Sequence, residues 1–357
     1  MLRKLVVFLI LAAGSWTFAA DHTSNITIMT QNMDDGTDQT YIVAASLGAI
    51  SGFTIPDAVD LTYAELQASH LPIRDVALAA QIAQRKPDLV TLQEASLWRV
   101  GPTPDTATTV LYDQITNLLS ALNNDGVPYD IVAVNAVNDV ALAGNQVPAL
   151  RFTDRDALLV RSDLRPPSFH LSDVHSNIFE ASLPFPALGT QIAAGWIAAD
   201  VHTGNQHFRL LTTHLLSPIS GVPAATLVQV AQAQQLLNEV RNSAVPVVLC
   251  GDFNSDALQG GGLDSTPTAP LIQAAGYPEV WPVLHPASDK GQTWPLYLED
   301  QFPPAPFFAL STPTERIDLF FTQGIQPVSI DRVLSPSLVA VPPFGSDHAG
   351  VIAVFQP

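Results

Sequence analysis

Basic side chains are scarce in this sequence of 357 residues. Lysine occurs only as Lys4, Lys86 and Lys290, and 33 acidic residues against 15 basic ones give a formal net charge of −18 at pH 7. Because phosphate neutralisation by basic side chains dominates nucleic-acid affinity, a polybasic nucleic-acid surface is excluded unless metal ions supply the positive charge. The acidity also disfavours anionic membranes, whereas peripheral contact with a zwitterionic membrane stays open.

Cysteine is almost absent. Cys250 is the only one in the sequence, so an internal disulfide is excluded. It lies inside a short apolar run, where we expect it to be a small buried core residue.

Only one stretch looks like a targeting or membrane segment. The apolar run 5–13 follows Arg3 and Lys4, and the small residues Thr17 and Ala19 fit a cleavage site after Ala19. This pattern predicts a signal peptide over residues 1–19. A membrane anchor is the alternative, but the run is too short to span a bilayer comfortably. No later segment resembles a transmembrane helix, so the mature chain, 20–357, is expected to be secreted or periplasmic.

The order of secondary structure favours two packed sheets with helices outside. A content of 47% hydrophobic and 13% charged residues is typical of a folded chain. Periodicity predicts helices at 75–85, 108–123, 224–241 and 270–275, and strands at 26–30, 89–92, 129–134, 157–160, 192–201, 208–213, 247–250, 317–322, 329–334 and 351–355. Residues 46–72 show no clear period and are expected to be a long surface excursion. Strands mixed with helices in this way indicate an α/β sandwich.

One stretch carries the first chemical signal. The buried strand from Val247 meets Gly251 and delivers Asp252 and Asn254 two residues apart, which places both side chains on one side if the backbone stays extended. A carboxylate and an amide at a strand end can orient water, bind a hard cation and hold a phosphate oxygen. Gly-Asp also ends many strands simply because both residues favour turns.

Other strands end in residues that suit the same chemistry. These fragments are Thr30-Gln31-Asn32, Leu92-Gln93-Glu94, Thr212-Thr213-His214-Leu215, Gly251-Asp252-Phe253-Asn254, Arg316-Ile317-Asp318 and Ser346-Asp347-His348. Their types and order resemble those of the endonuclease/exonuclease/phosphatase superfamily, which has a deoxyribonuclease-I-like fold. The resemblance spans nearly all of the chain after residue 20. It implies an α+β fold, a four-layer α/β/β/α sandwich of two mixed sheets, and a metal-dependent phosphoesterase.

The resemblance also implies a metal site. Glu94 would be the principal Mg²⁺ ligand, and Asn32 and Asp347 would lie beside it and bind directly or through water. Mg²⁺ suits this set because it prefers oxygen ligands and keeps several waters, and Mn²⁺ or Ca²⁺ are the alternatives. A surface acid that caps the next segment is the other interpretation of Glu94.

The same resemblance implies the catalytic roles. His348 and Asp318 would form an oriented imidazole–carboxylate pair that stabilises charge on a phosphoryl oxygen. Asp252 would orient or deprotonate the attacking water, Asn254 would hold a non-bridging oxygen, and His214 would bind phosphate or protonate the leaving group. The alternatives are an edge position facing water for Asp318 and an ordinary turn residue for His214.

Arg155 and the acidic loop after Asn32 carry weaker signals. Arg155 resembles a phosphate-contacting arginine of some relatives, and an ion pair with a flanking aspartate is equally consistent. Asp34, Asp35 and Asp38 lack the later glutamate of a calcium loop, so we expect solvated acids.

The reaction implied is hydrolysis of a phosphate ester by in-line attack of water, on a lipid or a small molecule. A secreted nuclease is the alternative, and a non-catalytic binding protein on the same fold is a minor one. Aromatic residues between 294 and 308, together with Phe344, either pack a long loop or rim the cleft toward an apolar substrate or a lipid surface. The tryptophan-cysteine-aspartate-arginine pattern of inositol phosphatases is missing around Asp318, which stands in Thr314-Glu315-Arg316-Ile317-Asp318.

Overall fold

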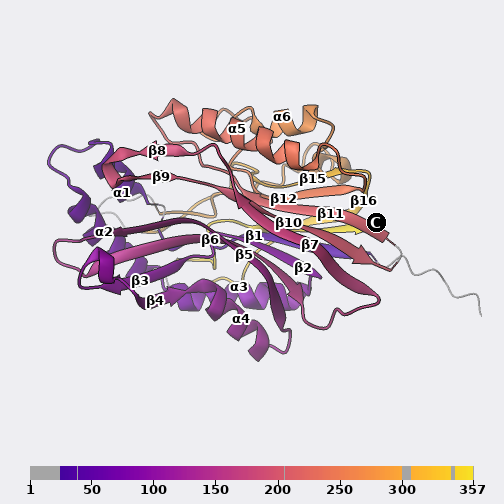
Figure 1. Ribbon diagram of the computed structural model, residues 1–357, viewed down its shortest axis with the longest axis horizontal. Coiled ribbons are helices and arrows are strands. Elements are labelled where there is room, and N and C mark those ends of the chain that lie inside the picture. Colours follow the sequence, from indigo (N-terminus) through magenta and orange to yellow (C-terminus); the bar gives the residue numbers. More distant parts are fainter. Residues whose placement is uncertain (1–24, 38, 205, 300–306, 339–341, 357) are drawn as a thin grey trace, which may run out of the picture.

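The computed structural model describes residues 25–37, 39–204, 206–299, 307–338 and 342–356 (Figure 1). The predicted signal peptide, Asp38 and Phe302 lie outside these residues. Among the described residues, no helix has both the length and the apolar character needed to cross a membrane.

Two mixed sheets form the centre of the molecule. The first has the strand order β16-β17-β1-β2-β6-β3-β4, with β5 paired to β6, and the second has the order β15-β12-β11-β10-β7. The strands of the first sheet are β1 (Ile26–Asn32), β2 (Leu89–Gln93), β3 (Leu97–Gly101), β4 (Thr109–Asp113), β5 (Tyr129–Leu142), β6 (Ala149–Arg161), β16 (Gln326–Val333) and β17 (Gly350–Gln356). Those of the second are β7 (Phe169–Ile178), β10 (Gly195–Thr203), β11 (Gln206–His214), β12 (Val247–Asp252) and β15 (Asp318–Gln323).

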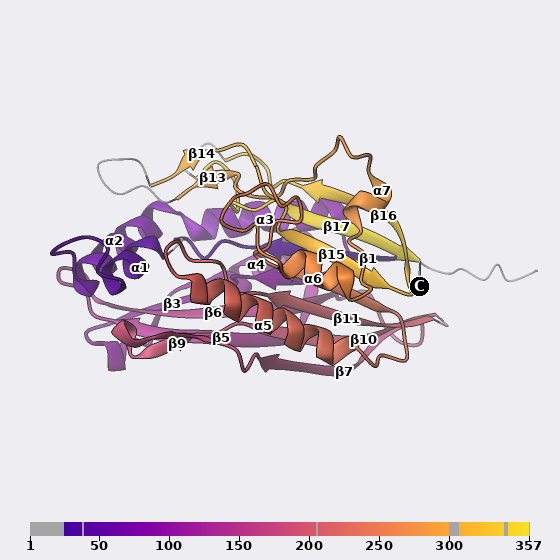
Figure 2. The ribbon, with the colours of Figure 1, turned by 90° about the horizontal axis from the view of Figure 1, so that it is seen from above.

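Helices cover the outer face of each sheet. The longer ones are α1 (Thr40–Ser46), α2 (Ile55–Ala68), α3 (Leu71–Arg85), α4 (Gln114–Asn124), α5 (Pro223–Val240) and α6 (Thr268–Ala274), followed by the short α7 (Trp281–Leu284). Two further two-stranded ribbons are β8 (Leu183–Phe185) with β9 (Thr190–Ile192) and β13 (Tyr297–Leu298) with β14 (Ala309–Leu310). Figure 2 shows α5 and α6 lying across the second sheet, while α1 and α2 lie at one end of the sandwich.

Three apolar clusters define the layers. Side chains such as Ile28, Val248 and Phe320 pack between the sheets. Leu78 of α3 packs with strand residues on the outer face of the first sheet, and Leu236 of α5 does so on the second. Together these clusters give helix, sheet, sheet and helix, so the four-layer sandwich predicted from the sequence is confirmed (Figure 1). Cys250 is fully buried between the sheets, as expected.

The expectation of an irregular excursion at 46–72 is wrong. Most of that segment is α2, which begins with a capping box in which the Thr54 hydroxyl accepts a hydrogen bond from the Asp57 N–H. Its buried face includes Thr62 and Glu65 as well as apolar side chains, so the sequence shows no clean apolar stripe. Because polar residues lie within its buried face, α2 could not be recognised from its apolar period.

Other boundaries differ from the predictions for local reasons. The helix expected at 108–123 begins only at Gln114, because 109–113 pairs with β3 as β4 and Asp113 caps the helix. The hairpin of β5 and β6 has 14 and 13 residues, far more than the predicted 129–134 and 157–160. Polar side chains along both strands interrupt the apolar runs from which strands are recognised.

Two acids of the loop after Asn32 are buried, contrary to the expectation of solvated acids. Arg74 of α3 pairs with Asp34 at 2.6 Å and donates to the carbonyl oxygens of Met33 and Gly345. Burial alone would raise the pKa of Asp34, but the Arg74 charge together with hydrogen bonds from Tyr297, Gly36 and Arg74 outweighs it and holds the pKa below its usual range. Asp35 pairs with no basic residue within the described part of the chain, and burial raises the pKa of its carboxyl well above the usual range.

Asp75 generates a stability prediction outside the candidate site. Burial raises the pKa of its carboxyl to about 7, and a hydrogen bond from Asn117 offsets only part of this. Because the folded pKa exceeds the unfolded value of about 3.9, the folded state holds more protons between these values. Stability is therefore lost as the pH rises from about 4 to 7, by up to about 1.4 kcal/mol per pH unit.

The substitution Asp75→Asn replaces this carboxyl by a neutral amide and should remove the loss of stability at rising pH. Relative to the parent, the variant should gain on the order of 3 kcal/mol in unfolding free energy between pH 4 and pH 8, measured by urea denaturation. Asp105→Asn, at an exposed position, is the control and should show no such gain. A gain that does not change with pH would contradict the buried neutral carboxyl.

Candidate active site

Strand ends bring the predicted residues together from both sheets. Asn32 ends β1 and Glu94 follows β2, two parallel neighbours in the first sheet. In the second sheet, His214 of β11 lies opposite Asp252 of β12, and Asp252 lies opposite Asp318 of β15. Since neighbouring strands are about 4.8 Å apart, this register aligns three functional side chains in one row.

Asp252 is the centre of the cluster. Its Oδ2 lies 3.0 Å from the Asn32 amide nitrogen, 3.7 Å from His214 Nε2 and 3.9 Å from His348 Nε2. His214 Nε2 also lies 3.7 Å from Glu94 Oε1. Two imidazole nitrogens, one from β11 and one from the loop before β17, therefore face one buried carboxylate oxygen.

His348 and Asp318 form the oriented pair expected from the sequence. The Nδ1–H of His348 donates to Asp318 Oδ2 at 2.9 Å, and both residues are buried. This bond fixes the ring so that Nε2 faces Asp252. Burial alone would lower the pKa of His348, but the charges of Asp318 and Asp347 outweigh it and raise the pKa well above the usual range. These charges favour the protonated imidazole, which can donate from Nε2.

His214 is cationic for a similar reason. Burial lowers its pKa, and the carboxylates of Asp252 and Glu94 reverse that effect and raise the pKa to about 9. The sequence alternative of an ordinary turn histidine does not match this position among carboxylates.

Glu94 is held rigidly next to Asn32. Its backbone adopts a left-handed conformation with φ of 52°, which is unusual for a residue with a long side chain. The Asn32 amide donates to Glu94 Oε1 at 2.9 Å, and the Asp35 N–H donates to Oε2 at 3.2 Å. The side-chain oxygen Oδ1 of Asn32 accepts a hydrogen bond from the Asp34 N–H, so the side-chain nitrogen is the atom that positions the carboxylates.

Asp347 and Asn254 lie at the edge of the cluster. Asp347 accepts a hydrogen bond of 2.6 Å from the Trp294 indole, and burial raises its pKa to about 8. Asn254 also has a left-handed backbone, and its side-chain amide donates to the Leu215 carbonyl. An amide nitrogen carries two hydrogens, so one remains able to donate to a ligand.

The structure does not place Arg155 in the cluster. Its guanidinium donates to the carbonyl oxygens of Ala95 and Ser96 and pairs with Asp113 at 2.6 Å. Side chains alternate along β6, so Arg155 points away from the face that carries Asp154 and Asp156. Both sequence interpretations, phosphate contact and pairing with a flanking aspartate, differ from this arrangement. The guanidinium supports the loop that follows Glu94.

Asp154 and Asp156 are the residues that sequence reasoning missed. Both are buried, and the His214 charge acts on both across the gap between the sheets. The two oxygens of Asp156 accept no hydrogen bond from any described residue. The two-residue spacing of these acids within a strand was the available signal, and it indicates that both face the same side.

The aromatic residues near the cluster mostly pack inward. Tyr297 and Phe308 are buried against each other, and the Tyr297 hydroxyl hydrogen-bonds Asp34. Phe307 is partly buried in the same cluster. This is the loop-packing alternative. Among Trp294, Tyr297, Phe307 and Phe308, the aromatic residues of 294–308 that the structure describes, Trp294 bonds to a site residue, Asp347.

The donor set fits a hard divalent cation. Glu94, His214 and Asp252 offer ligand atoms within 4.8 Å of one another, and so do Asp252, Asp318 and His348. A protonated imidazole cannot coordinate a metal, so the carboxylates are the ligands of these two groups that suit a hard cation. Burial raises the pKa of Glu94, and the two imidazolium charges offset only part of the effect. Together with the unpartnered oxygens of Asp156, this excess of buried carboxylates is what a bound cation would balance.

The molecule is thus a two-sheet sandwich whose strand ends and adjoining loops bring together acids and two histidines. The model of the Endonuclease/Exonuclease/phosphatase family matches residues 51–348, and the chain belongs to this family. Its members are metal-dependent phosphoesterases and nucleases. Comparison with curated proteins gives no match.

Solved structures share the fold at low sequence identity. An endonuclease/exonuclease/phosphatase from Beutenbergia cavernae is 18% identical with a TM-score of 0.54, over 93% of this chain and 71% of that one. A family protein from Bacteroides thetaiotaomicron is 13% identical with a TM-score of 0.53, over 93% and 95%. TDP2 from D. rerio, solved with a single-strand DNA product, is 15% identical with a TM-score of 0.51, over 93% and 99%.

The His348–Asp318 pair generates a prediction that does not depend on turnover. In Asp318→Asn the negative charge beside Nδ1 is lost, so the pKa of His348 should fall by more than one unit. NMR titration of the imidazole in metal-free protein measures this directly. Asp331→Asn, at an exposed position of β16, is the control. An unchanged His348 titration would contradict the pairing.

Proposed function

We propose that this protein hydrolyses a phosphate ester by in-line attack of water, assisted by a divalent metal ion, and that it acts outside the cytoplasm. The observation that carries the proposal is the pair of imidazole Nε2 atoms facing one oxygen of Asp252 beside Glu94. Cationic imidazoles next to a carboxylate suit a reaction that develops negative charge on phosphoryl oxygens while a water loses its proton.

Each site residue has a separate role in the proposed reaction. Glu94 and Asp347 would hold Mg²⁺, which when bound supplies charge stabilisation at the phosphoryl oxygens. Asp252 would accept the proton of the attacking water, because its Oδ2 lies within 4 Å of both imidazole Nε2 atoms, 3.7 Å from that of His214 and 3.9 Å from that of His348. His348, oriented by Asp318, donates from Nε2 to a non-bridging oxygen.

Two further residues complete the assignment. His214 stands across Asp252 from His348 and would protonate the leaving group or bind phosphate. Asn254 would donate its remaining amide hydrogen to the phosphoryl group, and Asn32 positions Glu94 and Asp252.

A nuclease is the second candidate function. It is favoured by the DNA product in the structure of TDP2 from D. rerio, which shares the fold. The net charge of −18 argues against it, because a nucleic-acid backbone would be repelled without bridging cations. The two candidates separate in a panel of DNA, RNA, sphingomyelin and small phosphodiesters under identical conditions.

The first test of the function combines metal removal with loss of one imidazole. With Mg²⁺, the protein should hydrolyse bis-p-nitrophenyl phosphate, and a chelator should abolish release of p-nitrophenol. His348→Ala should lower kcat by two to four orders of magnitude, since general acid–base and charge-stabilising groups each contribute about that much. His175→Ala, at an exposed position on β7, is the matched control. Equal turnover of His348→Ala and the parent would remove the proposed mechanism.

The second test addresses the metal ligand. Glu94→Gln preserves the shape of the side chain but removes its charge, so half-saturation with Mg²⁺ should shift to a concentration at least tenfold higher. Titration of activity against Mg²⁺ gives the shift, and isothermal calorimetry gives binding without substrate. Glu180→Gln, at an exposed position, should leave both curves unchanged. If Glu94→Gln also leaves them unchanged, Glu94 is not the principal ligand.

A further inference from the structure

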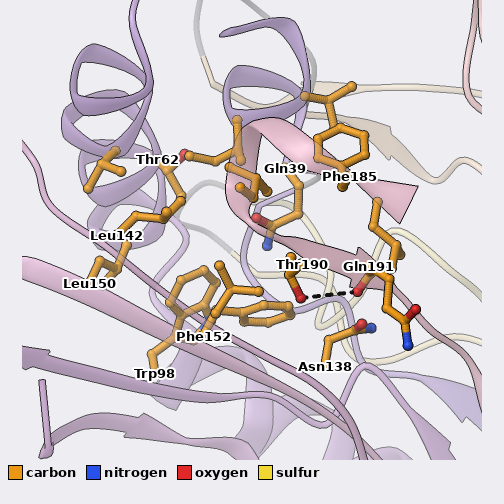
Figure 3. A pocket seen from close by; sticks show the side chains of 16 residues that line it. Gln39, Thr62, Trp98, Asn138, Leu142, Leu150, Phe152, Phe185, Thr190 and Gln191 are labelled. Carbon is orange, nitrogen blue, oxygen red and sulfur yellow. Dashed lines mark hydrogen bonds between the residues drawn. The ribbon is translucent and has the colours of Figure 1, made fainter. Parts of the chain in front are cut away.

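An apolar pocket lies at the end of the sandwich that carries α1 and α2. It has a volume of about 130 Å³, and its walls come from α1, α2, β3, β5, β6 and the β8–β9 ribbon. None of its lining side chains is charged, although the chain as a whole is strongly acidic. Figure 3 shows Leu142 and Leu150 on one side of the pocket and Asn138, Thr190 and Gln191 on the other.

The amide-bearing side of the pocket is connected to the candidate active site. Gln39 lines the pocket and donates to Asp35 Oδ2 at 3.3 Å, and the Asp35 N–H donates to Glu94 Oε2. Asn138, also in the lining, donates to Asp154 at 3.4 Å. Hydrogen bonds of Asp35 thus link Gln39 in the pocket wall to Glu94, the proposed metal ligand.

A second contact fixes the floor of the pocket to the same loop. The indole of Trp98 donates to the Asp35 carbonyl oxygen at 2.7 Å, and its ring packs on Phe152 with a centroid distance of 4.6 Å. Both rings line the pocket. The loop that bonds to Glu94 therefore also holds the aromatic floor in place.

Size and polarity select the kind of group that fits. A cavity of about 150 Å³ lined by apolar side chains holds one benzene ring. A pocket of about 130 Å³ therefore suits a single ring or a short alkyl chain. A phosphate or an ammonium group would lose its hydration there without a charged partner.

We propose that this pocket binds an apolar alkyl or aryl group that is esterified to the phosphate in the active site. The inference rests on the proposed function and narrows its substrate class to phosphodiesters with one apolar ester group. The phosphate would lie among Glu94, Asp252 and His348, and the apolar group would extend past Gln39 and Asn138 into the pocket.

The test uses methyl, butyl, hexyl and phenyl diesters of p-nitrophenyl phosphate, which share one leaving group. Each buried methylene is worth about 0.8 kcal/mol, or about fourfold in kcat/KM. From methyl to butyl, kcat/KM should therefore rise by on the order of fiftyfold and then level off when the pocket is full. A maximum at phenyl identifies an aryl group, and a maximum at butyl or hexyl identifies an alkyl chain.

A filled pocket should abolish this preference. Val140 of β5 lines the pocket, and Val140→Trp should reduce the butyl-to-methyl and phenyl-to-methyl ratios of kcat/KM toward one. Val110→Trp makes the same substitution at an exposed position of β4 and should keep the parent ratios. Leu188, between β8 and β9, also lines the pocket, and Leu188→Trp replaces Val140→Trp if that variant does not fold.

Equal kcat/KM values for all four diesters in the parent would overturn the proposal while leaving the phosphoesterase function intact. Preserved ratios in a folded pocket-filling variant would do the same. If no diester is hydrolysed, the proposed function fails, and binding tests the pocket by itself. Phenylphosphonate should then raise the Tm of the parent more than methylphosphonate does, with no difference in Val140→Trp, and equal shifts in the parent would overturn the pocket.

Discussion

The arrangement of the site depends on the pairing of β12 with both of its neighbours. Parallel pairing with β11 sets His214 beside Asp252, and antiparallel pairing with β15 sets Asp318 on the other side. At Gly251, a Cβ atom would lie 1.9 Å from the Thr213 carbonyl oxygen, so only glycine permits the strands to approach here. A slip of one residue would turn each of these side chains to the opposite face.

This register concentrates like charges, and the energetics of the site follow from that. Burial raises the pKa values of Glu94, Asp154 and Asp156, and the charge of His214 offsets only part of the effect at each of them, with a further contribution from His348 at Glu94. Buried charges without full compensation cost stability, and such groups gather where chemistry needs them. A divalent cation among these carboxylates would relieve the repulsion, so metal binding and stability are expected to be linked.

Alternation along β6 connects the site to its support. Asp154 and Asp156 face the gap between the sheets, whereas Arg155 faces outward and bonds to the loop after Glu94 and to Asp113 at the start of α4. The same strand also contributes Leu150 and Phe152 to the apolar pocket. The strand β6 thus supplies two acids to the proposed reaction centre, an arginine that supports the loop after Glu94, and two side chains that line the pocket.

The sequence by itself indicated a sandwich and the succession of strand-end residues, because apolar runs and polar ends are local signals with a fixed period. The meeting of Asp252, His214, His348 and Asp318 was implied by the resemblance of these fragments to a family, and their spacing alone did not fix it. The sequence did not reveal α2, whose buried face includes Thr62 and Glu65, or the burial of Asp34 by Arg74. Only the tertiary structure showed which way Arg155 points, that Asp156 is buried near His214, and that a pocket lies beside Gln39. Those features depend on which face of one strand meets side chains from distant segments, and no local pattern encodes that choice.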